Sequence, residues 1–236
     1  MWSGKSVAVV VPAFDEALRV GRVIRRMPRW VDAIVVVDDG SRDETAHVAR
    51  TTADVRVEVV RHAVNRGVGA AIVTGYTRAV HRGADVIAVM AGDDQMDPAD
   101  LASLVEEVTS GRGAYAKGNR FVHPDRRHMP LSRRIAGKAL AAATRLTTGL
   151  AIDDSQCGYT AISRDAAARL PLHELWPRYG YPNDLLGMLA EAGFRVVEVP
   201  IRPIYAGEAS GVRPWHALVI LRLLGRRLWS SAARST

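Results

Sequence analysis

Acidic side chains gather at two places in the sequence, each directly after a short apolar run. Asp38 and Asp39 form one cluster, and residues 93–95, with the sequence Asp-Asp-Gln, form the other with Asp97 close behind. Carboxylate and amide oxygens are the ligands that Mg²⁺ and Mn²⁺ prefer, and a metal bound in this way holds phosphate oxygens in turn. A carboxylate at the end of a strand can also accept hydrogen bonds from ribose hydroxyls or from the edge of a base. The two clusters therefore indicate a site for a divalent metal and a nucleotide.

The second cluster also contains a good helix start. Asp97 precedes Pro98, and Asp100 would lie in the first turn, where acidic side chains are favoured. We therefore assign Asp97 to the cap of a helix. Asp93 and Gln95 are the better candidates for metal ligands.

The first cluster leaves two interpretations open. Asp38 and Asp39 follow four apolar residues, which favours a functional role, but two acids at this place could equally close a capped loop. The next helix could be capped by Ser41 or Asp43. Spacing alone does not decide between a nucleotide contact and a loop cap.

No other motif supports a different chemistry. Gly67 and Gly69 begin a pattern like the dinucleotide fingerprint G-x-G-x-x-G, but Ile72 occupies the position of its third glycine. We interpret these glycines as a helix entry at which the backbone approaches another segment closely. Cys157 is the only cysteine, so there is no internal disulfide, and we expect it to be a packing residue rather than a nucleophile.

Strands and helices alternate over the first 110 residues, and this alternation would position the clusters. Apolar runs predict strands, and apolar residues at helical spacing predict helices. Along the chain we expect strand 7–11, helix 15–27, strand 34–37, strand 55–60, helix 69–80, strand 85–90 and a helix after Pro98. Such a pattern predicts a parallel α/β sheet with crossover helices, in which ligands bind beyond the carboxyl ends of the strands. Both acidic clusters fall at such ends.

The pattern changes after Arg120. We expect a helix over 131–150, a polar loop over 153–159, a strand at 160–163, a helix over 184–192, a strand at 195–199 and a final helix over 213–233. The predicted organisation is a domain over residues 1–210, with a nucleotide-binding half at 1–116 and an acceptor half at 117–210. Residues 211–236 would form a basic, amphipathic C-terminal helix.

Positive charge is confined to two segments. The chain has a net charge of +7, whereas residues 117–150 alone carry +7 and residues 211–236 carry +5. The remaining segments are mildly acidic, at −2 for 1–116 and −3 for 151–210. We do not expect nucleic acid as a partner, because the basic segments lack aromatic stacking platforms interleaved with their arginines.

Composition and hydropathy indicate a folded protein without a membrane span. Hydrophobic residues make up 48% of the chain and charged residues 24%, which excludes wholesale disorder. A span would need an uninterrupted apolar run of about 18 residues, and we find none. Residues 1–6 have no features of a secretory signal. We therefore expect a cytoplasmic protein.

Seven short motifs occur in a known order. They are VVVPAFDE at 9–16, VDDGS at 37–41, NRGVG at 65–69, MAGDDQMDP at 90–98, GNR at 118–120, DSQCGY at 154–159 and EVP at 198–200. The series resembles family 2 glycosyltransferases with a GT-A fold and is most similar to the dolichyl-phosphate mannose synthase-like branch. The resemblance implies a Rossmann-like, mostly parallel sheet with flanking helices, and an enzyme that uses a nucleotide sugar.

The resemblance also implies roles for individual residues. Nucleotide contacts are implied for Pro12, Phe14 (Tyr in most of the family), Glu16, Val37, Asp39, Gly92 and Asp93. A divalent metal, Mg²⁺ or Mn²⁺, would be held by Asp93 and Gln95. Lys117 and Arg120 would face the diphosphate.

This chain departs from the family's metal motif. Where the motif reads D-A-D-x-Q, residues 91–95 read Ala-Gly-Asp-Asp-Gln, so the first acid is missing. Asp94 is an additional acid that could compensate for it.

The implied reaction inverts the configuration of the transferred sugar. We expect the metal and Arg120 to stabilise the charge that grows on the departing diphosphate. A lipid phosphate acceptor is already ionised and needs no base, whereas a hydroxyl acceptor needs a carboxylate, for which Asp154 is preferred over Asp184. The leading hypothesis is transfer to polyprenyl phosphate. The alternatives are transfer to the hydroxyl of a saccharide or small molecule, and a nucleotide-sugar-binding protein without transferase activity.

The two basic segments then have a candidate role. Helices over 126–150 and 213–234 could lie on the inner face of an anionic membrane, with their apolar sides down and their arginines at the headgroups. Alternatively, they pack their apolar sides against the sheet or pair within an oligomer. The resemblance favours a peripheral position on the membrane, where a lipid-phosphate acceptor would be found.

Overall fold

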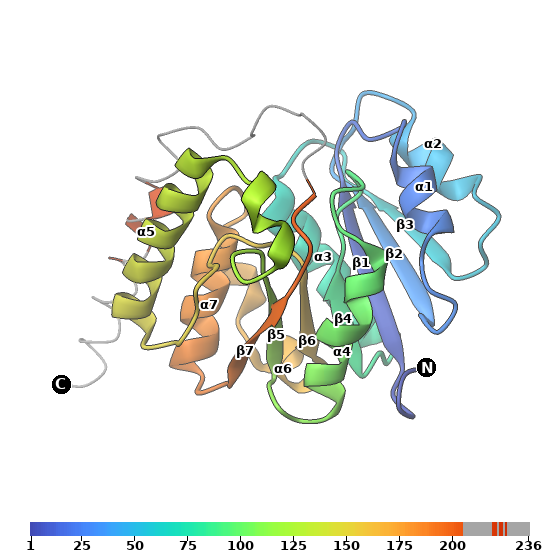
Figure 1. Ribbon diagram of the computed structural model, residues 1–236. Helices are drawn as coiled ribbons and strands as arrows, with labels where there is room; N and C mark the ends of the chain where they lie inside the picture. Colours follow the sequence, from blue (N-terminus) through green and yellow to red (C-terminus); the bar gives the residue numbers. More distant parts are fainter. Residues whose placement is uncertain (205–218, 221, 224, 226–236) are drawn as a thin grey trace.

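One mixed sheet of seven strands runs through the described part of the chain (Figure 1). The structure is a computed structural model that describes residues 1–204, 219, 220, 222, 223 and 225. The strands are β1 (Val7–Ala13), β2 (Ala33–Asp38), β3 (Val57–Arg61), β4 (Val86–Val89), β5 (Tyr115–Asn119), β6 (Thr160–Ser163) and β7 (Val196–Pro200). Their order is β3-β2-β1-β4-β6-β5-β7, and all run parallel except β6, which is antiparallel to both of its neighbours. The mostly parallel α/β sheet is therefore confirmed.

Helices cover both faces of this sheet. They are α1 (Val20–Arg25), α2 (Thr45–Arg50), α3 (Val68–His81), α4 (Leu101–Thr109), α5 (Leu131–Thr148), α6 (Arg164–Arg169) and α7 (Tyr181–Glu191), with short 3₁₀ turns at Pro98–Asp100, Pro124–His128 and Leu172–Glu174. In β1, Val7, Val9 and Val11 share a buried cluster with α1 and α4, whereas Ala8 and Val10 share one with α3 and α7 on the other face. Burial on both faces explains the unbroken apolar run of this strand.

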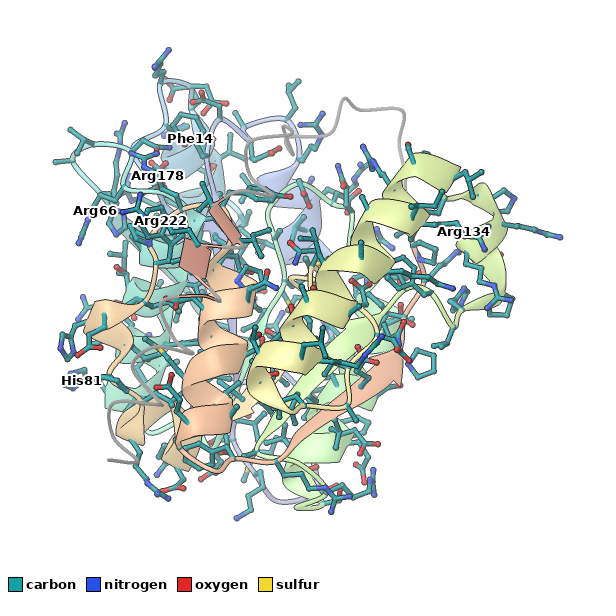
Figure 2. All side chains as sticks on the ribbon, turned by 90° about the vertical axis from the view of Figure 1, so that its left-hand side faces the viewer. Phe14, Arg66, His81, Arg134, Arg178 and Arg222 are labelled. Carbon is teal, nitrogen blue, oxygen red and sulfur yellow. The ribbon has the colours of Figure 1, made fainter. Side chains whose placement is uncertain are left out.

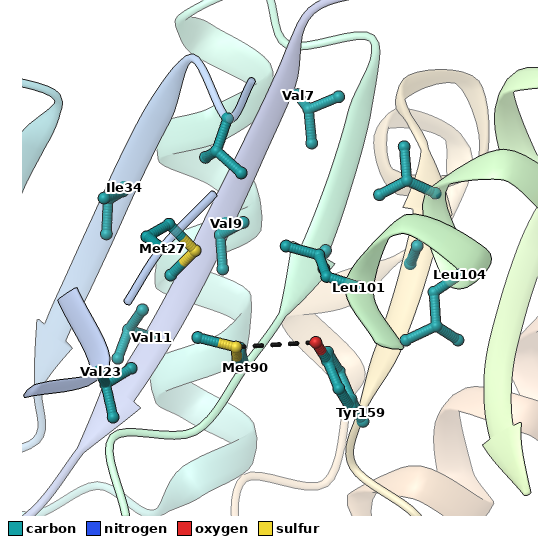
Figure 3. Packing of buried hydrophobic residues seen from close by; sticks show 14 of the residues in the cluster. Val7, Val9, Val11, Val23, Met27, Ile34, Met90, Leu101, Leu104 and Tyr159 are labelled. Atoms are coloured by element: carbon teal, nitrogen blue, oxygen red, sulfur yellow. Dashed lines mark hydrogen bonds between the residues drawn. The ribbon is translucent and has the colours of Figure 1, made fainter. Parts of the chain in front are cut away.

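The cluster that includes α1 and α4 reaches the loop after β4 (Figure 3). Val9 and Leu101 lie in its interior, and Tyr159 is buried at the end nearest β6. The Tyr159 hydroxyl donates a hydrogen bond to the Asp97 carbonyl (2.9 Å) and lies 3.7 Å from Met90 Sδ. These contacts join the segment before β6 to the loop that follows β4.

Helix α3 begins and crosses the sheet in close contact with other segments. A Cβ on Gly75 would lie 2.1 Å from Val10 Cγ1, so only glycine lets the helix approach β1 this closely. Gly67 has a φ of +100°, which suits glycine, and a Cβ on Gly69 would lie 2.3 Å from the Trp176 carbonyl oxygen. The predicted helix entry with close backbone approach is confirmed.

Residues 15–19 do not form the expected start of the first helix. Asp15 has a φ of +55°, Leu18 is 95% exposed, and α1 begins only at Val20. The backbone N–H groups of residues 15–17 donate instead to Ser41 and Asp43 of the loop after β2 and to Thr45, the first residue of α2. Side-chain acceptors from another loop therefore replace the first helical turn and join the loops after β1 and β2.

Strand β5 is not predicted by the hydropathy pattern. Its sequence, Tyr-Ala-Lys-Gly-Asn, contains two polar residues, yet all five residues are buried. The strand pairs in parallel with β7 and in antiparallel with β6, so both of its edges are used. The polar residues Lys117 and Asn119 belong to the site described below.

Helix α5 presents an apolar side to solvent. Leu131, Ile135 and Leu146 are 66%, 62% and 86% exposed. The helix packs through small residues, among them Gly137 and Ala141. The alternative in which this apolar side packs against the sheet is therefore wrong for α5.

Most of the predicted C-terminal helix lies outside the described residues. Of its described positions, Ile220 and Leu223 are buried, and a Cβ on Gly180 would lie 3.4 Å and 3.1 Å from their side chains. No helix in the described ranges is long and apolar enough to cross a membrane. The assignment of a nucleotide half (1–116) and an acceptor half (117–210) stays a prediction.

Candidate active site

The carboxyl ends of β1, β2 and β4 meet at one edge of the sheet, and backbone hydrogen bonds join the loops that follow them. Asp39 N donates to the Ala13 carbonyl (2.9 Å), and Gly92 N donates to the Pro12 carbonyl (3.0 Å). Pro12 is buried and lies opposite Val37 in the sheet register. The residues that the sequence assigns to the nucleotide therefore lie along a single edge.

The loop after β1 offers an aromatic ring at this edge. Phe14 is 38% exposed, and Figure 2 shows it near one end of the molecule. The Glu16 carboxylate lies 2.9 Å from Arg19 Nη1 and is engaged in an ion pair. The exposed ring of Phe14 could stack on a ligand. The Glu16 carboxylate could contact a nucleotide only while it is also paired with Arg19.

Asp39 is buried and holds the start of α3. Its Oδ1 lies 2.7 Å from His62 Nδ1 and accepts a hydrogen bond from Arg66 N (2.9 Å), and its Oδ2 accepts one from Gly67 N (2.7 Å). The other ring nitrogen of His62 lies 3.0 Å from Thr74 Oγ1. These bonds support the loop-closing role of Asp39, and its contact with a nucleotide stays a prediction.

The two aspartates of the loop after β4 have different partners. Asp93 Oδ1 accepts a hydrogen bond from Gln95 N (3.1 Å), so the two candidate ligands belong to one turn. Asp94 has a φ of +59°, and its carboxylate pairs with Arg22 of α1 and, at 3.1 Å, with Arg26 directly after α1. These ion pairs count against a role for Asp94 in place of the missing first acid.

A metal could be held here only with help from a ligand. No group of three or more His, Cys, Asp or Glu residues that could hold a metal ion occurs among the described residues. Asp93 and Gln95 supply one carboxylate and one amide. Mg²⁺ commonly takes one or two carboxylates together with substrate phosphates, so this pair fits a metal that is bound with a phosphorylated ligand.

A buried ion pair joins β5 to the loop before β6. Asp154 is fully buried, and its carboxylate accepts hydrogen bonds from Arg120 Nε (2.7 Å), Nη2 (2.9 Å) and N (3.1 Å). Burial raises the pKa of Asp154, but the charge and hydrogen bonds of Arg120 outweigh it, and the pKa lies below its ordinary value. Asp154 is therefore held ionised and is a weak proton acceptor, which counts against its predicted role as a base.

Lys117 lies behind this pair rather than on the surface. It is fully buried, and its ammonium group donates to the Cys157 carbonyl. Burial lowers the pKa of Lys117, and the nearby Cys157 and Asp154 offset part of this effect. Glu198 completes the cluster by accepting hydrogen bonds from Asp153 N (2.9 Å) and Asp154 N (2.8 Å). A contact between Lys117 and a diphosphate would require this segment to open.

Asp184, the second candidate base, lies in the first turn of α7. It is 1% exposed, and its Oδ2 accepts a hydrogen bond from Trp176 N (2.8 Å). The preceding residue, Asn183, is fully buried and bonds to Gln156 Nε2 (2.6 Å) and Thr144 Oγ1 (2.7 Å). The start of α7 is thus joined to both the loop before β6 and α5.

Sequence reasoning gave no role to several residues at this end of the sheet. Gln156 N donates to Asp154 Oδ1 (3.2 Å), although the only signal for Gln156 is its place inside the DSQCGY motif. Burial raises the pKa of Tyr179, and the charges of Arg120 and Arg133 partly offset this. Arg120 and Arg133 of α5 are thus the positive charges that act on the pKa of Tyr179.

The edge of the sheet thus divides into two chemically different parts. Beyond β1, β2 and β4 lie the exposed ring of Phe14 and the Asp93 turn, which suit a nucleotide diphosphate with a metal. Beyond β5 and β6 lie Arg120, Asp154 and Asp184, which combine a fixed positive charge with two carboxylates. Such an arrangement can hold a donor at one end and present an acceptor at the other.

Comparison with known proteins identifies the family of the chain. Residues 8–170 match the family described as Glycosyl transferase family 2. The UDP-N-acetylglucosamine–dolichyl-phosphate N-acetylglucosaminyltransferase of Methanococcus voltae is 27% identical over 240 residues, covering 95% of each chain. The polyprenol monophosphomannose synthase of Mycolicibacterium smegmatis is 33% identical over 202 residues, covering 82% of this chain and 75% of that protein. The crystal structure of glucosyl-3-phosphoglycerate synthase from Mycobacterium tuberculosis with Mn²⁺, UDP-glucose and phosphoglyceric acid has a TM-score of 0.69 at 23% identity, covering 97% of this chain and 80% of that one.

The order of the strands and the similarity to this structure define a GT-A-like fold. The chain belongs to glycosyl transferase family 2. It is a glycosyltransferase that uses a nucleotide sugar, as the seven motifs predict.

Replacing Asp154 with asparagine is expected to remove a pH-dependent part of the stability. Because the pKa of Asp154 is lower in the folded protein than in the unfolded chain, its ionised form stabilises the fold at neutral pH. This contribution is lost as the pH falls below the ordinary value of 3.8 and through the folded-state pKa. At neutral pH the substitution should cost about 3 kcal/mol of unfolding free energy, because the Arg120 charge loses its carboxylate.

Urea denaturation at several pH values measures this contribution. The difference between wild type and Asp154→Asn should shrink as the pH is lowered from about 4. Asp153→Asn is the control, because the Asp153 side chain is 67% exposed. A difference for Asp154→Asn that is the same at all pH values would contradict the assignment of a depressed pKa.

Proposed function

We propose that this enzyme transfers a sugar from a nucleotide sugar to a polyprenyl phosphate at the surface of an anionic membrane, with the help of a divalent metal. The observation that carries the proposal is the ion pair of Asp154 with Arg120, which lowers the pKa of the preferred candidate base. A lipid phosphate arrives ionised and needs no base, whereas a hydroxyl does. Two relatives, named for dolichyl phosphate and for polyprenol monophosphomannose, support the same acceptor class.

In the proposed reaction an oxygen of the lipid phosphate attacks the anomeric carbon of the sugar. The bond between that carbon and the diphosphate breaks, its electron pair leaves with the nucleoside diphosphate, and the configuration inverts. Arg120, oriented by Asp154, and Arg133 supply positive charge next to Tyr179, where the lipid phosphate would bind. Charges fixed in this way stabilise a phosphate without having to reorganise during the reaction.

A divalent metal, Mg²⁺ or Mn²⁺, would be held by Asp93 and Gln95 together with phosphate oxygens of the donor. When bound, it would neutralise charge on the departing diphosphate. The related synthase whose structure contains Mn²⁺ and UDP-glucose supports this choice of group. The turn that joins Asp93 to Gln95 keeps the two side chains in one loop.

Helix α5 supplies the membrane-facing surface in this proposal. Its exposed apolar side chains are Leu131, Ile135 and Leu146, and residues 126–145 contain six Lys and Arg residues and no acid. Apolar side chains flanked by basic ones are typical of a helix that lies on anionic lipid. Figure 1 shows α5 on the outside of the molecule, and Figure 2 shows Arg134 projecting from it. A peripheral position on the cytoplasmic face would bring this helix to its lipid acceptor.

Transfer of sugar to polyprenyl phosphate is the first expected outcome. The full chain with Mn²⁺ and labelled UDP-glucose, UDP-N-acetylglucosamine or GDP-mannose is offered undecaprenyl phosphate, undecaprenol and phosphoglyceric acid in parallel. Product should form on undecaprenyl phosphate. Product that forms only on a hydroxyl acceptor would contradict the proposal. Asp184 would then be the candidate base.

Asp93→Ala is expected to lower the metal-dependent transfer rate by about 100-fold, because the donor phosphates lose the carboxylate that holds their metal. Asp94→Ala is the matched control in the same loop. Its carboxylate pairs with α1, and loss of such a pair should change the rate by less than about fivefold. Initial rates as a function of Mn²⁺ concentration make the comparison. Equal losses of transfer rate in the two variants would contradict the assignment of Asp93 as a metal ligand.

Leu131→Ser combined with Ile135→Ser is expected to weaken binding to anionic vesicles by about tenfold, because apolar area that would enter the bilayer is lost. Co-sedimentation with phosphatidylglycerol vesicles at low salt measures the partition coefficient. Leu18→Ser combined with Val55→Ser is the control, since these residues are 95% and 99% exposed and lie outside α5. Unchanged binding of the α5 variant would contradict the proposed surface.

A further inference from the structure

Gln156 lies between the loop after β4 and the first turn of α7. Its loop leads into β6, which pairs with β4. A Cβ on the neighbouring Gly158 would lie 3.7 Å from Met96 Cε and 3.1 Å from Tyr181 Oη, so the loop touches both elements. Gln156 itself is half-buried. Gln156 therefore lies at the same end of the sheet as the candidate metal ligands. It is hydrogen-bonded to Asp154, one candidate base, and to Asn183, the residue before the other candidate base, Asp184.

Hydrogen bonds determine which way the Gln156 amide points. Thr144 donates its hydroxyl proton to the Leu140 carbonyl (2.8 Å), so towards Asn183 it can only accept. Asn183 Nδ2 donates to Thr144 (2.7 Å), which leaves Asn183 Oδ1 to accept from Gln156 Nε2 (2.6 Å). The second Nε2 proton of Gln156 goes to Ser155 Oγ (2.9 Å).

Both donors of the Gln156 amide are therefore used inside the protein, and its oxygen Oε1 is turned away from them. Among the described residues Oε1 has no hydrogen-bond partner, and it does not belong to the buried side-chain atoms that lack one. It is therefore not fully buried. A carbonyl oxygen with a direction fixed in this way is preorganised to accept a hydrogen bond from a ligand.

We infer that Gln156 Oε1 accepts a hydrogen bond from one hydroxyl of the transferred sugar and thereby helps to select that sugar. The inference rests on the proposed function. The base and ribose would lie beyond β1 and β2, and the diphosphate would lie at Asp93. The part of the donor that extends further, towards Asp154 and Asp184, is the sugar. Its hydroxyls are the donors that a neutral amide oxygen can read.

Thr144 is then a positioning residue. It contacts Asn183 and not the ligand, but by accepting from Asn183 it keeps both amides in one orientation. Without the Thr144 hydroxyl, the two amides can turn over and present Gln156 Nε2 at the surface in place of Oε1. Recognition of the sugar would therefore depend on a side chain of α5.

Binding of UDP, UDP-glucose and its 2-, 3-, 4- and 6-deoxy analogues in the presence of Mn²⁺ tests the inference. Wild type should bind one analogue about tenfold more weakly than UDP-glucose, because that analogue leaves Oε1 unpaired. Gln156→Met keeps the chain length without the amide oxygen, and it should bind this analogue and UDP-glucose equally while its affinity for UDP is unchanged. The inference is overturned by a difference that persists in Gln156→Met, by the absence of any difference in wild type, or by equal wild-type affinity for UDP and UDP-glucose.

The role of Thr144 is tested by the same measurement. Thr144→Val should reduce the difference between UDP-glucose and the weak analogue, and Thr144→Ser should restore it. Thr147→Val is the matched control, because Thr147 also donates to carbonyls of α5 and its hydroxyl forms no hydrogen bond outside that helix among the described residues. A merely structural effect would weaken UDP and all donors together, and that result would contradict the positioning role.

The two proposals fail in different ways. Discrimination that depends on Gln156, in an enzyme that transfers no sugar to polyprenyl phosphate, would leave the sugar contact in place and contradict the acceptor. Transfer to polyprenyl phosphate, with discrimination that Gln156→Met does not change, would contradict the sugar contact and leave the acceptor in place.

Discussion

The buried ion pair between Arg120 and Asp154 is the interaction on which the proposed acceptor end of the site depends. Burying opposite charges is costly unless hydrogen bonds replace the lost water, and removal of one partner would leave the other charge uncompensated. Arg120 provides three hydrogen bonds to Asp154, and Gln156 N provides a fourth. Glu198 of β7 holds the backbone of the same loop. Strands β5 and β7 and the loop before β6 are therefore fixed at one point, and the positive charge of the site is in place before any ligand binds.

The donor end is held by a different kind of contact, and one short segment connects the two ends. Side chains of the loop after β2 and of the first residue of α2 accept hydrogen bonds from the backbone N–H groups of residues 15–17, which orders the loop after β1. The segment before α7 then reaches across: the Pro177 carbonyl accepts a hydrogen bond from Ala70 N (3.1 Å), and Trp176 N donates to Asp184 (2.8 Å). The starts of α3 and α7 are thus both hydrogen-bonded to one short segment, residues 176 and 177.

The sequence predicts every strand of the sheet except β5, and the reason is physical. β-Branched runs identify β1, β2 and β4 because both of their faces are apolar, and the carboxyl-end rule then locates the site. Strand β5 escapes this reasoning, since Lys117 and Asn119 are buried only because a cluster assembled from distant segments supplies their partners. The same holds for the orientation of Gln156, which no local pattern encodes. Helical spacing predicts α5 correctly. It does not predict that the side with the small residues is buried and the side with the larger apolar residues is exposed.

In the proposed function helix α5 would combine two tasks, because it packs through small residues. Gly137 and Ala141 let it lie close to its neighbours, and Thr144 reaches Asn183 from the same side. Its larger apolar side chains are left outside, where the acceptor lipid is proposed to be. A displacement of α5 on a membrane would act first on the hydrogen bond of Thr144 and then on the Gln156 amide. Each of these neutral hydrogen bonds is worth about 1 kcal/mol, so coupling between acceptor engagement and sugar recognition through this route is limited to about a tenfold change in affinity.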